Sequence, residues 1–165
     1  MSLIFKRIKW FTAILAIFFA CSKNNEPEPL IERTFRLLYD SDGMRKGVDA
    51  FISLSEKSFR DPAYSAAAAI IVYKADTISR SQVETRFQCR KGDRLYLHVV
   101  FPDIANSGAA KPAMASFLSG VMYINNSKAG GTALRYSDYQ NSSKRYTDPA
   151  GKVHLLAEIP IDVKE

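Results

Sequence analysis

Residues 153–163 read VHLLAEIPIDV and carry the clearest pattern in the chain. Every second residue is apolar, and the residues between them are mostly polar or charged. The apolar series consists of Val153, Leu155, Ala157, Ile159, Ile161 and Val163. Such alternation is typical of a β-strand with one buried face. Because Pro160 has no N–H to donate, we expect this strand to lie at a sheet edge near that residue.

The same period of two runs through most of the chain from Leu30 onward. It predicts further strands within residues 34–39, 48–54, 82–89, 95–101 and 117–125. Only a short polar turn, containing Arg90-Lys91-Gly92-Asp93, separates two of these runs. We therefore expect residues 82–101 to form a β-hairpin.

Residues 61–75 combine a pattern typical of a helix with one typical of a strand. Asp61 and Pro62, followed by alanines, are typical of a helix start, whereas Ile70 to Tyr73 favour a strand. We expect a short helical or irregular turn near 61–66 and a buried strand over about 67–75. Taken together, six to eight short strands joined by close turns predict a single antiparallel β-sandwich over residues 30–165.

Composition sets limits on function. The chain has 165 residues, an ordinary length for one domain, and carries 23 Lys and Arg against 17 Asp and Glu. Part of the excess positive charge lies in residues 1–20, and the rest is dispersed. This distribution does not predict a nucleic-acid partner. Two cysteines and two histidines exclude a disulfide framework and a standard Cys/His zinc site, and we expect no cofactor.

The amino terminus has the pattern of a targeting signal. Residues 1–20 read MSLIFKRIKWFTAILAIFFA, a basic segment followed by an apolar run from Trp10. As a helix this run rises about 16 Å, against about 30 Å for a hydrocarbon core, so it predicts a secretory signal peptide. The following Phe18-Phe19-Ala20-Cys21 resembles the lipobox of bacterial lipoproteins. That resemblance implies that Cys21 carries a lipid; an ordinary signal peptide with an incidental cysteine is the alternative.

Residues 21–29, CSKNNEPEP, predict the lipidated cysteine and a flexible tether. Ser22-Lys23 followed by polar and acidic residues is similar to the export signal of surface lipoproteins in some Gram-negative bacteria. Together the two resemblances imply a cell-envelope protein held in the outer membrane by the lipid on Cys21. Display on the cell surface is favoured over the periplasmic face, and both stay open.

A further resemblance concerns the fold. The pattern Phe87-x-Cys89-x-Lys91-Gly92-Asp93-x-Leu95-Tyr96-Leu97, followed by the strand ending at Asn125, resembles small Ig-like lipoprotein sandwiches, including the MmpS-like type. It implies an Ig-like β-sandwich with an accessory or binding role. No catalytic residues come with it.

Candidate catalytic side chains are few. His98 and His154 have no acidic or thiol ligand at metal-binding spacing, so we expect structural histidines. Cys89 is in phase with apolar residues, which predicts a buried thiol. We therefore predict no catalytic residue and no metal site. A small envelope hydrolase, built on Cys89 or His98 with distant carboxylates, is the least favoured alternative.

The best candidate for ligand binding is the segment RYSDYQNSSKRY, residues 135–146. Tyrosines between Ser, Asn, Asp and Arg are typical of contact loops in antibodies. We expect a ligand to contact Arg135, Tyr136, Tyr139 and Tyr146. The alternative is a polar connection whose tyrosines pack back onto the sandwich.

One modification site is also indicated. Asp76-Thr77-Ile78 is similar to the O-glycosylation acceptor of some Gram-negative bacteria, which makes Thr77 a candidate. The sequence as a whole predicts a non-enzymatic envelope lipoprotein that binds, or assembles with, envelope proteins or glycans. A structural, fimbria-like subunit is the main alternative.

Overall fold

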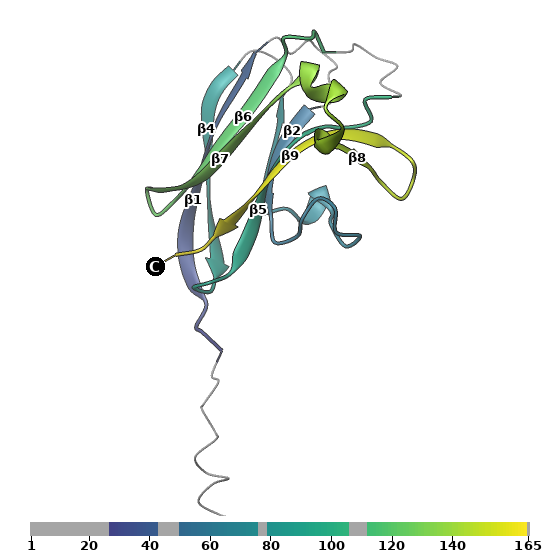
Figure 1. The fold of residues 1–165 in the computed structure, drawn as a ribbon. Coiled ribbons are helices and arrows are strands. Elements are labelled where there is room, and N and C mark those ends of the chain that lie inside the picture. Colours follow the sequence, from purple (N-terminus) through teal and green to yellow (C-terminus); the bar gives the residue numbers. More distant parts are fainter. Residues whose placement is uncertain (1–26, 43–49, 76–78, 106–111, 165) are drawn as a thin grey trace, which may run out of the picture.

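The structure is a computed structural model that describes residues 27–42, 50–75, 79–105 and 112–164. Within these ranges the strands form two antiparallel sheets that face each other (Figure 1). The four-stranded sheet has the order β4-β1-β6-β7, formed by Ser79–Cys89, Ile31–Asp42, Phe117–Ile124 and Ser127–Arg135. The five-stranded sheet has the order β3-β2-β5-β9-β8, formed by Ile71–Ala75, Ala50–Ser55, Arg94–Phe101, Val153–Asp162 and Arg145–Thr147. The predicted all-β sandwich is confirmed.

The core lies between the sheets and is built from every second residue of the strands. The largest fully buried side chains are Phe35, Phe101, Leu37, Ile52, Leu54, Leu95, Leu97, Leu118, Met122, Leu134, Leu155 and Ile161. Tyr39 and Tyr73 stack across the two sheets, with their ring centroids 3.5 Å apart. The expected sheet edge at Pro160 is also confirmed, because β8 pairs with β9 only over Val153–Leu155.

The predicted hairpin over residues 82–101 is wrong. β4 pairs with β1, whereas β5 pairs with β2 and β9, so the turn between β4 and β5 crosses from one sheet to the other. The Gly92 and Val163 N–H groups fix this turn, donating to Val163 and Asp93 carbonyls at 2.9 Å. Alternation shows which face of a strand is buried but not which strand lies beside it. Both strands turn their apolar faces to the same core from opposite sides.

Residues 61–75 also differ in part from the prediction. The turn contains a short 3-10 helix, Ala66–Ala68, and the strand β3 begins only at Ile71. β3 is an edge strand, and Val72 is 40% exposed, so the strand is not buried throughout. The structure adds β7 and β8, which the pattern had not indicated. β6 and β7 meet in a tight turn where Asn125 and Asn126 have φ of 47° and 66°, a conformation that asparagine tolerates.

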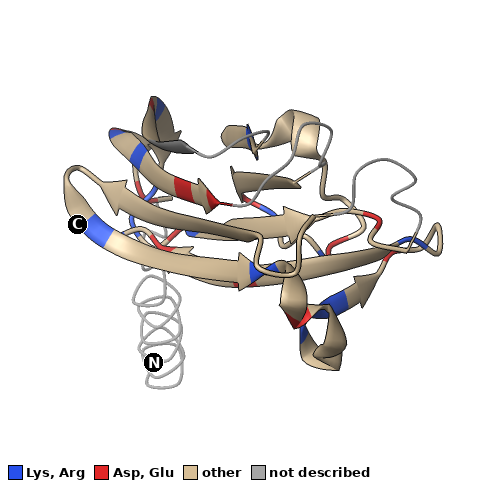
Figure 2. Ribbon diagram, turned by 90° about the horizontal axis from the view of Figure 1, so that it is seen from above, with Lys and Arg blue, Asp and Glu red and all other residues tan. Residues whose placement is uncertain are grey.

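Several sequence predictions fall outside the described residues, namely the signal peptide, Cys21 and Thr77. In the part of the chain that is described, no helix is long and apolar enough to cross a membrane. Figure 2 shows basic and acidic residues spread over several strands and loops.

Candidate functional site

The two sheets differ in what lies on their outer faces. Residues 56–70, here called the strap, lead from β2 to β3 across the outer face of the five-stranded sheet. Local hydrogen bonds shape the strap: the Tyr64 N–H donates to the Asp61 carbonyl at 2.9 Å, and the Ala63 N–H donates to the Asp61 carboxylate at 2.8 Å. The strap covers a group of polar side chains that the sheet turns outward.

The carboxylate of Glu158, on β9, holds the strap in place. It accepts hydrogen bonds from the Ser58 hydroxyl at 2.9 Å and from the Phe59 N–H at 2.6 Å. On its inner side, Oε2 lies 3.1 Å from Nε2 of His98. Burial raises the pKa of Glu158, but the contacts with His98, Phe59 and Ser58 outweigh it. The pKa therefore lies below its ordinary value of 4.5.

The polar chain continues under the strap. His98 is fully buried, and its Nδ1 lies 3.0 Å from the hydroxyl of Ser53. The Ser53 hydroxyl is in turn 3.0 Å from the hydroxyl of Tyr64, whose pKa is raised mainly by burial. Tyr64, Ser53, His98 and Glu158 thus form one connected network from the strap and three neighbouring strands. Buried polar groups are costly unless they are paired in this way.

The network contains a serine, a histidine and a glutamate, the residue types of a hydrolase triad. Ser53 is fully buried, so under the strap it is not accessible to a substrate. Cys89 is 1% exposed, and burial raises the pKa of its thiol more than the nearby Arg33 lowers it. A reactive cysteine needs the opposite, a lowered pKa and access. The geometry therefore favours a structural role for His98 and Cys89.

Aromatic rings extend the network toward β8. Phe59 lies 5.4 Å from the ring of His154 and 5.9 Å from that of Tyr146. On the Tyr146 ring there is also a cation–π contact, with the guanidinium of Arg60 5.5 Å from the ring centroid. Nε2 of His154 is 3.1 Å from Asp148, and this contact is the main reason that the pKa of Asp148 is lowered. His154 is thus held by protein groups.

A cavity of about 310 Å³ opens beside Glu158, between the strap, β9, β7 and the loop before β8. Its lining residues are Arg60, Thr132, Ser143, Lys144, Leu156, Ala157 and Glu158. The ammonium of Lys144 also contacts Asp138 at 2.8 Å. The cavity thus has two cationic side chains, two hydroxyls and an apolar wall. It also contains the Glu158 carboxylate, whose oxygens accept hydrogen bonds from Ser58 and Phe59 of the strap.

The structure does not bring the four predicted ligand-binding residues together. Tyr136 is 7% exposed and packs on Phe101 with the ring centroids 5.6 Å apart, so its ring belongs to the core. Tyr139 lies beside it, at 5.9 Å, and is 37% exposed. Arg135 lies over Phe117 of the four-stranded sheet, whereas Tyr146 lies on Phe59 and Arg60. Ligand binding by these residues stays a prediction.

The same segment nevertheless borders the cavity through Ser143 and Lys144. The sequence pattern did not indicate these two residues as part of a site, nor did it indicate Arg60 and Glu158. A usable signal was present, because Ser53, His98 and Glu158 are polar residues at outward positions of three strands. What the pattern lacks is the strand order that makes them neighbours.

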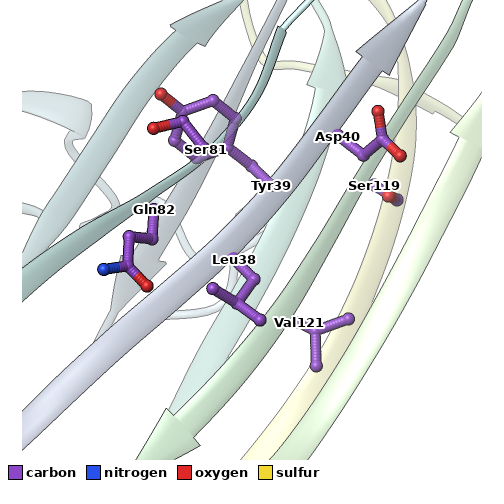
Figure 3. A pocket seen from close by; sticks show the side chains of 7 residues that line it. All are labelled: Leu38, Tyr39, Asp40, Ser81, Gln82, Ser119 and Val121. Carbon is purple, nitrogen blue, oxygen red and sulfur yellow. The ribbon is translucent and has the colours of Figure 1, made fainter.

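Among the described residues, no segment covers the outer face of the four-stranded sheet in a comparable way. It contains a shallow groove of about 480 Å³ (Figure 3). The groove is lined by Leu38, Tyr39, Asp40, Ser81, Gln82, Ser119 and Val121. At one end of this face the Arg36 guanidinium lies 5.0 Å over the ring of Tyr123.

No family model, curated protein or solved structure matches the chain. Among the described residues, no group of three or more His, Cys, Asp or Glu side chains is arranged to hold a metal ion.

Proposed function

We propose that the protein is a non-enzymatic envelope lipoprotein, held in the outer membrane by a lipid on Cys21, whose β-sandwich binds an acidic glycan. The observation that carries the glycan part is the cavity beside Glu158. Its volume of about 310 Å³ lies at the small end of the range for small-molecule sites, about 300–1,000 Å³. It suits one sugar unit of a longer chain.

The charges of the cavity support an acidic unit. Arg60 and Lys144 both line it, and guanidinium groups bind carboxylates through paired hydrogen bonds. The carboxylate of Glu158 would repel an anion, but Ser58, Phe59 and His98 already bind its oxygens from the protein side. Because Lys144 already contacts Asp138, Arg60 is the main cationic group that the cavity offers to an acidic ligand.

The remaining lining supports a sugar rather than an inorganic anion. The hydroxyls of Ser143 and Thr132 are suited to hydrogen bonds with sugar hydroxyls. Leu156 and Ala157 give an apolar wall for the C–H groups of a pyranose ring. A site that mixes apolar surface with a few placed polar groups is typical for small ligands.

Binding is tested with a chain that starts at Glu26, because the strands and the core lie between Ile31 and Val163. Calorimetric titration compares oligosaccharides of galacturonic acid with those of galactose. We expect binding of the acidic series only, and Arg60→Ala to weaken it at least about tenfold. Arg94→Ala removes the same charge outside the cavity and should leave binding unchanged. Equal binding of both series, or equal loss in both variants, would contradict the proposal.

The anchor is tested separately in full-length protein. In a Gram-negative host we expect the chain to sediment with outer membranes and to incorporate labelled palmitate. Cys21→Ala should abolish the label and release the protein from the membrane fraction. A Cys21→Ala protein that stays in that fraction would show that the attachment does not need the lipid.

A further inference from the structure

The strand β4 is a long sheet edge. Its residues Ser79–Cys89 pair with β1 over the whole strand, and β4 stands at the end of the order β4-β1-β6-β7. In the described residues no strand pairs with its other side. Edge strands expose unpaired N–H and C=O groups, and natural proteins normally keep such edges short or block them. An edge of this length can therefore form backbone hydrogen bonds with a strand from another molecule.

The side chains of β4 alternate in a regular way. On the outer face Gln82, Glu84, Arg86 and Gln88 are exposed. On the inner face Val83, Thr85 and Phe87 are only half-buried, and Val83 and Phe87 pack against the edge of the core. Another strand beside β4 would cover more of these inner apolar side chains.

The order of these side chains is self-complementary about Thr85. We propose that two copies of the chain pair antiparallel through β4, with the twofold axis at Thr85. Glu84 then lies opposite Arg86 of the partner subunit, and Arg86 opposite the partner's Glu84. On the inner face, each Val83 lies opposite the partner's Phe87. Cross-strand pairs of opposite charge and of apolar side chains both stabilise antiparallel sheets.

Neighbouring registers are disfavoured by the same residues. An axis at Glu84 places that carboxylate opposite its own copy, and an axis at Arg86 places two guanidinium groups opposite each other. An axis between residues pairs outer side chains with inner ones, which a continuous sheet does not permit. Glu84 and Arg86 thus favour the axis at Thr85 over an axis at either of these two residues, while the backbone hydrogen bonds supply most of the affinity.

The existing contacts of β4 permit this pairing. Arg86 lies 3.6 Å from Glu32, but the two side chains are 73% and 56% exposed, so this ion pair is weak and is readily exchanged. A twofold contact of this kind is closed, because each copy uses the same edge. The result is a dimer with one continuous eight-stranded sheet, and it does not depend on glycan binding.

Charge reversal tests the register. The chain from Glu26 is studied by sedimentation equilibrium as wild type, Glu84→Arg, Arg86→Glu and the double variant. We expect a wild-type dimer, a dissociation constant raised at least about tenfold in each single variant, and recovery in the double variant. Lys128→Glu, on the opposite edge strand β7, should leave the dimer intact. A monomeric wild type, or a double variant no tighter than the singles, would overturn the proposal.

A crosslink in the full-length protein gives a second measurement. A cysteine introduced by Thr85→Cys lies beside its own copy at the axis, so mild oxidation should give a disulfide-linked dimer. Val83→Cys places the thiol opposite the partner's Phe87 and should not crosslink. Equal crosslinking of the two variants would show a different register and overturn the assignment of the axis to Thr85.

Discussion

Strands of both sheets alternate between apolar and polar residues, yet the outer face of one sheet is covered and that of the other is open. On the five-stranded sheet, Ser53 and His98 are fully buried, because Tyr64 and Phe59 of the strap lie over them. On the four-stranded sheet, Leu38 and Val121 line an open groove (Figure 3). The strand pattern alone therefore does not determine whether an outward side chain meets water.

The difference depends on how the strap is held. Glu158 accepts hydrogen bonds from two neighbouring strap residues, and the ring of Phe59 contacts His98, His154 and Tyr146. Polar side chains become tolerable under a cover when each finds a partner. The carboxylate of Glu158, here called the clamp, thus holds the strap over the sheet, and the polar side chains beneath the strap become buried.

The largest effect is expected from Glu158→Gln, which removes the charge and keeps the size of the side chain. Hydrogen bonds to a charged group contribute about 1.5–3 kcal/mol, so we expect the free energy of unfolding to fall by about 2–3 kcal/mol. Urea unfolding followed by circular dichroism measures this change.

The matched control is Asp162→Asn, on the same face of β9. Its carboxylate pairs with Arg94 at 2.9 Å, but both side chains are more than half exposed. Exposed ion pairs contribute little, so the unfolding midpoint should hardly move. Similar losses in the two variants would mean that Glu158 does not act as a clamp.

A smaller effect is expected from a pair of serines in central parts of the two sheets. Ser53→Ala leaves His98 and Tyr64 without their shared partner, which should cost about 1–2 kcal/mol. Ser119→Ala makes the same change on the open face and should stay within about 0.5 kcal/mol of wild type. Both variants are compared by urea unfolding. A larger loss of stability in Ser119→Ala than in Ser53→Ala would contradict the view that the strap buries the outer face of the five-stranded sheet and leaves the other face open.

The sequence predicts the strands well where one face is buried and the other meets water. β1 and β6 follow this rule, and the alternation of apolar residues in the sequence locates them and β9 closely. Alternation does not give the strand order: the sequences of β4 and β5 both alternate, yet the two strands lie in different sheets. It also misses β7, which contains Gly130 and Gly131 and has few buried residues. An alanine Cβ at Gly130 would come within 2.6 Å of Cδ1 of Ile161, so the Ile161 side chain on β9 would have to move.

The candidate site was less predictable than the fold. Ser53 and His98 are 45 residues apart, and Phe59 and Glu158 are 99 apart, so their contacts depend on strand order. The segment 135–146 has the composition of a contact loop, yet the ring of Tyr136 packs on Phe101 in the core, and its backbone N–H donates to the Ser116 carbonyl. Composition indicated the region of the cavity but not which side chains face it.

The smallest effect concerns pH. Since the pKa of Glu158 is lowered in the folded state, the clamp contributes its full stability above the ordinary value of 4.5 and loses it as the pH falls through the lowered value. Its neighbours are His98 and Tyr64 on the protein side and Arg60 and Lys144 at the cavity. Hydrogen exchange measures the outcome. Acid should reduce protection of the Phe59 N–H relative to β6 amides, and Glu158→Gln should remove that pH dependence. Equal loss of protection in β6 would indicate global acid unfolding instead of release of the strap.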